Sequence, residues 1–380
     1  MTAIWSFPTR IVFGAGEAAR SGQEAEGAGM QRALIVTDAG VVKAGLGDRV
    51  QKSLEAAGIK TRVFDGVHGN PIEENVEQGC AAFAKHRADG VVCIGGGSSM
   101  DAGKLVALRA RVQRPFEELD DAVDGWRHIP ADLPPIIALP TTAGTGSEVG
   151  RSAVVTLRST GRKTVIFAPS LLPRVAILDP ELTRSMPART TAATGFDALT
   201  HCVEAYLSKG DHPMADAIAL AGIDLVATCL PAVMADPADI EARGGMMKAA
   251  MMGAVAFQKG LGACHSLAHP LSSECGLHHG LANALCLPAV VDFNEQAALE
   301  RVLHVGLLLG GEAERGACSA ALRKLRAAIG LPVGLSGAGV REGQLPALAD
   351  KAFEDACHHA NPRACTRDDL LALYRSSFDA

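Results

Sequence analysis

The sequence has few aromatic residues, no long apolar run and no excess of positive charge. Aromatic side chains make up 4% of the 380 residues, which offers no obvious stacking platform for an aromatic substrate. The 36 lysines and arginines against 42 aspartates and glutamates give a formal charge of −6. A mildly acidic surface argues against nucleic acid or an anionic membrane as a partner. No uninterrupted apolar run reaches the roughly 18 residues of a membrane span. Met1–Arg10 has no apolar core, so we expect no signal peptide and a cytoplasmic protein.

The ten cysteines include no C-x-x-C pair. A zinc ribbon or redox motif is therefore not expected, and the thiols are predicted to be reduced, buried small hydrophobes. The histidines are distributed differently, because six of the twelve lie between His201 and His279. Chemistry is expected in that segment.

The first half alternates short apolar runs with segments of helical spacing. The expected strands are Ile11–Phe13, Ala33–Val36, Thr61–Phe64, Gly90–Ile94, Pro135–Pro140 and Val175–Leu178. Helices are expected at 46–57 and 72–86 and from about Ala102. Continuous apolar strands separated by helices predict a doubly wound, Rossmann-like parallel sheet that is covered on both faces.

The pattern changes near residue 185. Alanine, leucine and methionine dominate from about Thr190, and β-branched runs nearly vanish. The expected helices are 190–207, 213–235, 238–258, 295–310, 315–329, 343–356 and 366–377. The sequence therefore predicts an α/β domain over 1–185 and an all-helical domain over 186–380.

A glycine-rich loop, Gly95-Gly96-Gly97-Ser98-Ser99-Met100-Asp101, follows a buried strand. Glycines allow close backbone approach, and the start of the next helix offers free N–H groups to a pyrophosphate. The alternative is a tight strand-to-helix turn without a ligand, since the loop lacks the G-x-G-x-x-G pattern.

Two further features follow strand ends. The loop Thr141–Glu148 is rich in threonine and glycine and could line the nicotinamide side of a dinucleotide. Asp38 follows the strand that ends at Val36; it could accept from ribose hydroxyls and favour NAD over NADP. The alternative for Asp38 is a helix N-cap.

The strongest chemical pattern is a set of carboxylate and imidazole groups. Asp197 and His201 are four residues apart, as are His265 and His269, and His279 follows ten residues later. Mixed Asp/His donors from separate helices suit Fe²⁺, Zn²⁺, Mn²⁺ or Co²⁺. An exposed ion pair is the alternative for Asp197 and His201, and a histidine before proline, such as His269, often ends a helix.

Five segments occur together in a characteristic order. They are the loop Gly95–Asp101, the loop Pro140–Glu148, Asp179-Pro180, the Asp197/His201 segment and the His265/His269/His279 segment. Together they resemble the iron-containing, or group III, alcohol dehydrogenases over roughly Phe7 to Ser377. The resemblance implies the dehydroquinate synthase-like architecture of an α/β dinucleotide-binding domain and an all-helical domain, with a metal in the cleft between them, in a homodimer.

Residue roles follow from this resemblance. It implies the metal ligands Asp197, His201, His265 and His279. It places the family's further histidine on His269, near the nicotinamide, where it could relay a proton as a catalytic residue. It implies dinucleotide contacts from Asp38, Asn70, Gly97, Ser98, Asp101, Thr141, Thr142, Thr145 and Lys163. Asp197 favours the metal-dependent branch, with Fe²⁺ as the implied ion and Zn²⁺ or Mn²⁺ as alternatives; His278 receives no role.

The predicted function is reversible hydride transfer between NAD(H) and a small primary alcohol or aldehyde held by the metal. Arg151 could instead pair with a substrate carboxylate, which would favour a hydroxy acid such as 4-hydroxybutyrate, or it could form a salt bridge. The residues also leave open a glycerol dehydrogenase-like or metal-independent reductase, a dehydroquinate synthase-like lyase and a non-catalytic nucleotide-binding protein.

Overall fold

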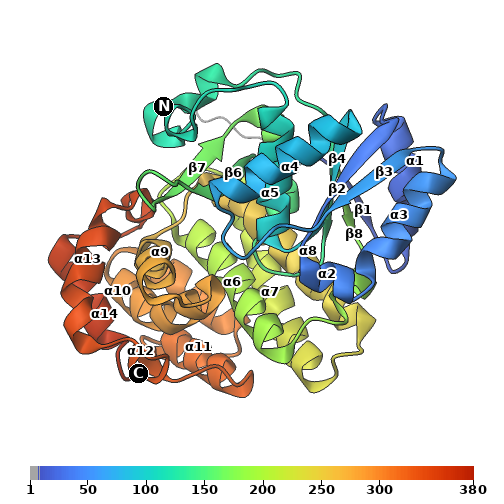
Figure 1. Ribbon diagram of the computed structural model, residues 1–380. Helices are drawn as coiled ribbons and strands as arrows, with labels where there is room; N and C mark the ends of the chain where they lie inside the picture. The colour runs from blue at the N-terminus through green and yellow to red at the C-terminus, as the bar shows by residue number, and fades with distance from the viewer. Residues whose placement is uncertain (1–6, 8) are drawn as a thin grey trace. The chain divides into compact units, whose positions relative to one another are not determined.

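The computed structural model describes residue 7 and residues 9–380, and they form two compact units. The α/β unit comprises Phe7–Thr142 and Gly146–Ser185, and the helical unit comprises Ala143–Thr145 and Met186–Ala380 (Figure 1). Most of the Met1–Arg10 segment, for which no signal peptide is expected, lies outside the described residues.

The α/β unit is built on a six-stranded parallel sheet with the order β1-β8-β5-β4-β2-β3. Its strands are β1 (Arg10–Phe13), β2 (Arg32–Val36), β3 (Lys60–Phe64), β4 (Gly90–Gly95), β5 (Ile136–Pro140) and β8 (Val175–Leu178). Its helices are α1 (Ser21–Gly27), α2 (Ala39–Lys43), α3 (Leu46–Ala56), α4 (Glu73–His86) and α5 (Gly97–Arg109). The predicted doubly wound sheet is confirmed.

The four central strands β8, β5, β4 and β2 are buried on both faces, whereas much of the edge strands β1 and β3 is exposed or half-buried. Leu34 and Val36 belong to one hydrophobic core, whereas Ala33 and Ile35 on the same strand belong to the opposite one. Successive side chains of a strand point to opposite faces, so a strand covered on both sides needs an unbroken apolar run. This burial explains why the central strands were recognisable in the sequence.

Two features of this unit differ from the prediction. Helix α5 begins at Gly97 rather than near Ala102, because extended Gly96 ends the loop and the first helical turn already contains Ser98. A separate antiparallel hairpin, β6 (Ser152–Thr156) with β7 (Lys163–Phe167), was not expected. Its strands alternate buried with half-buried or exposed residues, and their apolar runs, Ala153–Val155 and Val165–Ala168, are short.

The helical unit contains nine α-helices among the described residues. They are α6 (Ala188–Leu207), α7 (Pro213–Ala235), α8 (Ile240–Ala256), α9 (Ala263–Cys275), α10 (His279–Leu308), α11 (Ala317–Ala328), α12 (Gly334–Gly337), α13 (Leu345–Glu354) and α14 (Arg367–Ser376). Helix α9 continues through Pro270, so the expectation that His269 ends a helix is wrong. Pro270 and Leu271 are buried, and their packing offsets the lost backbone hydrogen bond.

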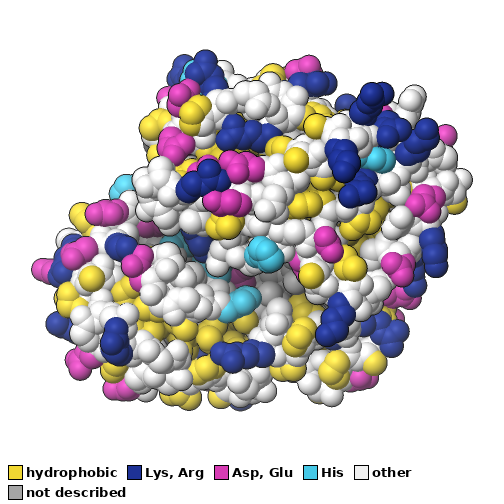
Figure 2. All heavy atoms as spheres, in the orientation of Figure 1, with side chains coloured by type: hydrophobic (Ala, Val, Ile, Leu, Met, Phe, Trp, Pro, Cys, Tyr) yellow, Lys and Arg dark blue, Asp and Glu magenta, His cyan; other side chains and the backbone are white. Residues whose placement is uncertain are grey.

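Helix α7 is, among the described residues, the one helix long and apolar enough to cross a membrane. It packs against α6 and α8 in the helical unit. Core helices of soluble proteins have the same length and composition, so α7 by itself does not indicate a membrane protein. On the face in Figure 2, acidic and basic side chains are interspersed, as the small net charge leads one to expect.

Candidate active site

Helix α6 presents Asp197 and His201 on one face, because residues four apart lie one turn above each other. Both side chains are buried, with 4% and 5% of their surfaces exposed. Gly253 of α8 lies against this face; a Cβ there would stand 2.9 Å from the His201 Cβ. The exposed ion pair considered for Asp197 and His201 is therefore not what the structure shows.

His265 in α9 and His279 at the start of α10 join Asp197 from separate helices. One potential ligand atom from each of the three residues lies within 4.8 Å of the others. The His279 Nε2 is 3.5 Å from the Asp197 Oδ1. Two donors that each stand about 2.1 Å from one ion can be at most about 4.2 Å apart, so this pair already has a suitable separation.

His201 is the fourth predicted ligand, and its position is less tight. It is not part of the group whose donor atoms all lie within 4.8 Å of one another. Its ring stacks on the ring of His265, with centroids 4.8 Å apart and planes at 17°. The structure thus brings three predicted ligands together and places the fourth beside them.

Unpartnered nitrogens test whether this group fits a cation. Among the described residues, the His201 Nδ1 and the His265 Nε2 are buried without any hydrogen-bond partner. Buried polar atoms are normally satisfied, and orphaned imidazole nitrogens beside a carboxylate are those that a metal would occupy. The donor set therefore fits a divalent cation.

The electrostatics of the group favour metal-binding protonation states. Burial lowers the pKa of His201 to about 4 and holds the pKa of His279 well below its usual range. Both imidazoles are then neutral at pH 7, the form whose lone pair binds a metal. Burial acts to raise the pKa of Asp197, but His201, His279 and other neighbours bring it below its ordinary value.

Three residues of this site were missed by sequence reasoning. Glu204 accepts from the His265 Nδ1, which lies 2.5 Å from its Oε2. Asn283 donates to the Asp197 Oδ1 at 2.8 Å, and Asp355 lies 2.8 Å from the His269 Nδ1. The i,i+3 spacing of Glu204 from His201 was a local signal, whereas Asp355 is 86 residues from His269 and gave none.

His269 and His278 differ from the predicted ligands Asp197, His201 and His265, which are buried. The side chain of His269 is 40% exposed, and its ring stacks on His279 with centroids 5.3 Å apart. This places the predicted proton relay at the edge of the cluster. His278 is the N-cap residue of α10, without a side-chain cap bond, and burial lowers its pKa.

In the α/β unit, predicted dinucleotide residues come together from three segments. The Asn70 N–H donates to the Ser98 Oγ at 3.2 Å, and the Lys163 Nζ donates to the Asn70 Oδ1 at 2.7 Å. Gly97 and Ser98 form the first turn of α5, directly after β4. A helix start with free N–H groups, a hydroxyl and an ammonium group suits an anion such as a pyrophosphate.

Asp38 lies at the carboxyl end of β2 and caps α2. Its Oδ1 accepts from the N–H groups of Gly40 and Val41 at 2.8 and 3.0 Å, so the N-cap alternative is correct. Its Oδ2 accepts from the Ser99 Oγ at 3.3 Å. One carboxylate oxygen therefore remains oriented toward the glycine-rich loop, and the ribose contact stays a prediction.

Asp101 lies inside the α/β unit rather than at its surface. Only 8% of Asp101 is exposed, and its two oxygens accept from the Ser147 Oγ and the Val154 N–H at 2.7 and 3.2 Å. The buried Lys104 ammonium donates among four oxygens of Ser147, Gly150 and Ser152, all within 3.0 Å of its Nζ. These bonds hold α5 against the end of the second loop and the segment that follows it. The contacts of Asp101 therefore show a structural role inside the unit.

The threonines of the second loop differ in exposure. Thr141 is buried and its N–H donates to the Gly95 carbonyl at 2.9 Å, whereas Thr142 is half-buried and faces Gly96. Thr145 is exposed and belongs to the helical unit. Gly95 has φ +151°, and a Cβ there would lie 2.4 Å from the Ser99 Oγ, so only glycine fits this turn.

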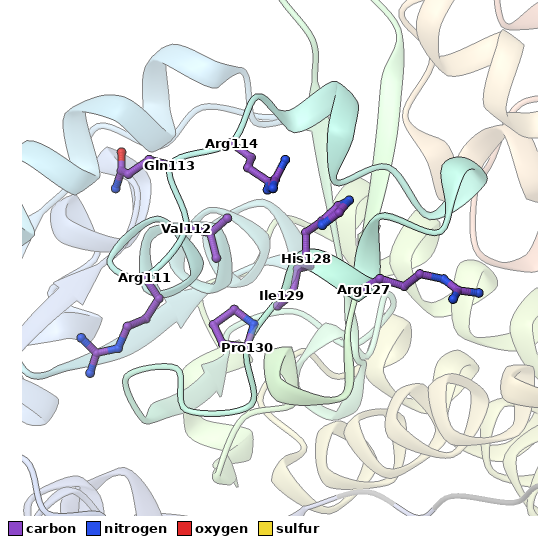
Figure 3. A pocket seen from close by; sticks show the side chains of 8 residues that line it. All are labelled: Arg111, Val112, Gln113, Arg114, Arg127, His128, Ile129 and Pro130. Atoms are coloured by element: carbon purple, nitrogen blue, oxygen red, sulfur yellow. The ribbon is translucent and has the colours of Figure 1, made fainter.

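A surface hollow elsewhere in the α/β unit contains none of the predicted site residues (Figure 3). It is lined by Arg111, Val112, Gln113, Arg114, Arg127, His128, Ile129 and Pro130. Its arginines point apart in Figure 3, and Arg114 and Arg127 pair with Glu118 and Asp124. Because the carboxylates neutralise these guanidinium groups, and because the groups point in different directions, the hollow does not form an anion-binding site.

A parallel sheet with glycine-rich loops at its strand ends and a buried Asp/His cluster are features of metal-dependent dehydrogenases that use a dinucleotide. Two family models match: iron-containing alcohol dehydrogenase over residues 8–180, and the C-terminal part of the Fe-containing alcohol dehydrogenase family over residues 191–378. The chain therefore belongs to the iron-containing alcohol dehydrogenase family. The predicted enzyme class and its cofactors, NAD and a divalent metal, are confirmed at this level.

Individual relatives agree along the whole chain. A 4-hydroxybutyrate dehydrogenase of Cupriavidus necator is 38% identical over 93% of this chain and 94% of its own length. An NAD-dependent methanol dehydrogenase of Bacillus methanolicus is 36% identical over 97% of this chain and 98% of its own. Among solved structures, a 1,3-propanediol oxidoreductase superposes with a TM-score of 0.95 at 36% identity and covers 100% of both chains.

Proposed function

We propose that this chain catalyses reversible hydride transfer between NAD(H) and a small primary alcohol or aldehyde, with Fe²⁺ as its metal. The observation that carries the proposal is the convergence of Asp197, His265 and His279, whose ligand atoms lie within 4.8 Å of one another. The relatives act on small alcohols, diols and aldehydes by their names, including 1,3-propanediol and lactaldehyde. Assays at 340 nm with Fe²⁺, Zn²⁺ or Mn²⁺ and a panel of alcohols test the proposal; no turnover with any pair would overturn it.

Asp197, His201, His265 and His279 would hold the cation. A divalent cation supplies Lewis-acid chemistry, because it lowers the pKa of a bound hydroxyl and polarises a carbonyl. The Asp197 carboxylate offsets part of the cation's charge, and Asn283 fixes one of its oxygens by a 2.8 Å hydrogen bond. His201 and His279 add neutral imidazoles to the donor set. Burial acts to lower the pKa of His265, but its bond to Glu204 brings that pKa above its ordinary value.

His269 would move the substrate proton to solvent. Its Nδ1 faces Asp355, so the carboxylate holds the proton on that nitrogen and leaves the Nε2 as an acceptor. Asp355 also accepts from the Ser266 Oγ and the Cys357 N–H, at 2.8 and 2.9 Å. Burial acts to raise the Asp355 pKa, but His269 and these donors hold it well below its usual range.

The dinucleotide would bind along the strand ends of the α/β unit. The start of α5 with Gly97 and Ser98 would hold the pyrophosphate, beside Asn70 and Lys163. Thr141, Thr142 and Thr145 would line the nicotinamide side, and Asp38 would accept from the ribose. Asp101 would act through the loop it holds in place, since both of its oxygens already accept from protein donors.

Replacement of Asp38 by glycine is expected to admit NADP. Removing the carboxylate removes its repulsion of a 2′-phosphate, so the ratio of kcat/KM for NADP to that for NAD should rise roughly 10- to 100-fold. The lost cap costs only a few tenths of a kcal/mol, because glycine is tolerated at N-caps. The matched control is Asp239→Gly, which removes the equivalent cap of α8. Equal cofactor ratios in both variants would argue against the ribose contact.

A hydroxy acid is the second candidate substrate, and Arg151 favours it. No carboxylate lies within salt-bridge distance of its guanidinium among the described residues, so the salt-bridge alternative for Arg151 is not found. The guanidinium instead lies 5.2 Å from the centroid of the Phe167 ring, where it is free to pair with a carboxylate. The relative from Cupriavidus necator is named for 4-hydroxybutyrate.

If this second candidate is right, Arg151→Ala should raise the KM for 4-hydroxybutyrate about tenfold or more and leave the KM for 1-butanol unchanged. A lost charge-assisted pair of about 1.4 kcal/mol or more corresponds to that factor. Arg158→Ala is the control, since Arg158 pairs with Glu74 and Glu77 on the surface. Equal changes for both substrates would leave the primary alcohol as the substrate class.

Net production of NADH from a simple alcohol separates this function from a lyase that recycles NAD within one turnover, and from a non-catalytic nucleotide-binding protein. Loss of turnover on metal removal separates it from a metal-independent reductase. The homodimer, which the family resemblance implies, and the cytoplasmic location are part of the proposal.

A further inference from the structure

Glu204 is a buried carboxylate that accepts hydrogen bonds both from the backbone at the start of α9 and from the ring of His265, a predicted metal ligand. It lies on α6, one turn beyond His201, and is 3% exposed. Its Oε1 accepts from the Cys264 N–H at 2.6 Å. Its Oε2 accepts from the His265 N–H at 3.3 Å and from the His265 Nδ1 at 2.5 Å. No basic side chain forms an ion pair with it among the described residues; its one charge partner is His265.

These three bonds have two consequences. The two backbone bonds satisfy N–H groups in the first turn of α9, which has no side-chain cap of its own. A negative charge at this end is also favoured by the helix dipole. The third bond keeps the proton of His265 on Nδ1, because a carboxylate can only accept. The lone pair of His265 is then on the Nε2, the atom that is buried without a partner.

We infer that Glu204 is the positioning residue that sets the tautomer and ring orientation of the metal ligand His265. The inference rests on the proposed function in one respect, namely that His265 binds the metal. Carboxylates behind ligand histidines commonly contribute 10- to 100-fold to metal affinity. Glu204 offers this contribution from the same helix that carries Asp197 and His201, so one helix supplies two ligands and the support for a third.

Gly262 provides independent support. Its backbone, φ −154° and ψ −159°, is extended, so any residue could adopt it. A Cβ at this position would nevertheless lie 2.8 Å from the Glu204 Oε1 and 2.9 Å from the Asn361 Oδ1. The glycine leaves the space that the carboxylate occupies. Gly262→Ala should therefore displace Glu204 from its three donors without changing Glu204 or any ligand.

The test is the affinity of metal-free protein for Co²⁺, measured by competition with a chromophoric chelator, together with the visible spectrum of the bound ion. Glu204→Gln should weaken Co²⁺ binding roughly 10- to 100-fold. The glutamine side chain has only one acceptor oxygen. Its NH₂ group must therefore face another donor, either a backbone N–H or the Nδ1 of His265, and that hydrogen bond is lost. Gly262→Ala should weaken binding severalfold, and both variants should change the Co²⁺ bands, which report ligand geometry.

Glu295→Gln is the matched control. Glu295 of α10 is also buried and capping: it accepts from the Gly316 N–H at 2.7 Å, and it pairs with Arg315 rather than with a histidine. This variant should lose comparable stability and keep the Co²⁺ affinity and spectrum of the parent. A loss of affinity equal to that of Glu204→Gln would mean a general structural effect and would overturn the inference.

The outcomes also separate this inference from the proposed function. Co²⁺ binding that is weak in His279→Ala but unchanged in a folded Glu204→Gln protein would overturn the inference alone. Equal binding by the parent and His279→Ala would overturn the proposed metal site and the inference with it. If Glu204→Gln does not fold, Gly262→Ala decides: parental affinity and spectrum in that variant would overturn the inference.

Discussion

Replacement of His265 by alanine is expected to remove the metal and to lower kcat roughly 10³-fold or more while the protein stays folded. Lewis-acid stabilisation is worth several kcal/mol, and about 4 kcal/mol corresponds to three orders of magnitude in rate. The fold should persist because Glu204 keeps its two backbone donors, the N–H groups of residues 264 and 265. Metal content by mass spectrometry, turnover at 340 nm and circular dichroism measure the three expected effects.

The control for this variant is His304→Ala in the same unit. His304 contacts the Tyr206 hydroxyl at 3.1 Å and is not part of the Asp/His cluster. It should keep the metal stoichiometry of the parent. Full activity in a metal-free His265→Ala protein would contradict the proposed chemistry, because turnover would then need neither His265 nor the metal ion.

The second large effect is expected from Gly280→Ala, a methyl group at the start of α10. A Cβ at Gly280 would lie 2.0 Å from the carbonyl oxygen of Ala193 and 3.0 Å from the Asp197 Cβ. Both contacts are with α6. The backbone and Cβ atoms of a helix cannot move aside as the end of a flexible side chain can. The start of α10 must therefore move, and His279 moves away from Asp197. We expect a loss of about 1–3 kcal/mol of stability from overpacking and, since ångström shifts of a reacting group cost about 100-fold, a fall in kcat of that size.

Gly337→Ala serves as the comparison, since a Cβ there meets nothing within 4 Å. That variant should match the parent in urea unfolding, metal content and kcat. Parental metal content and turnover in Gly280→Ala would show that the close approach of α6 and α10 is not what sets the ligand geometry.

The strands of the sheet were predictable because their signal is local. Residues 90–94 form a continuous apolar run, and burial on both faces requires one. The β6–β7 hairpin has only short apolar runs, and its strands alternate buried residues with half-buried or exposed ones. The sequence pattern thus identified the strands of the parallel sheet, including the partly exposed β1 and β3, but not the separate hairpin.

Two helices of the helical unit that contain a proline differ from the prediction. Pro270 lies within α9 and Pro288 within α10, and neither helix was predicted at its observed start. A proline inside a helix costs about 3 kcal/mol in isolation. Burial of the surrounding residues outweighs that cost, and packing of this kind is not visible in a short window of sequence.

The sequence by itself determined the chemical character of the site. Residue types and helical spacing indicated a mixed Asp/His cluster, since i,i+4 neighbours share a face in any helix. The resemblance to the iron-containing alcohol dehydrogenases then implied that Asp197, His201, His265 and His279 are the metal ligands.

Only the tertiary structure decided which groups support these predicted ligands. It placed Glu204 behind His265, Asp355 behind His269 and Asn283 beside Asp197, and it gave Asp101 an internal role. The reason is physical: the position of a residue within one helix follows from the fixed helical repeat. The separation between two helices is set instead by all the side chains packed between them, down to the missing methyl groups of glycines such as Gly280.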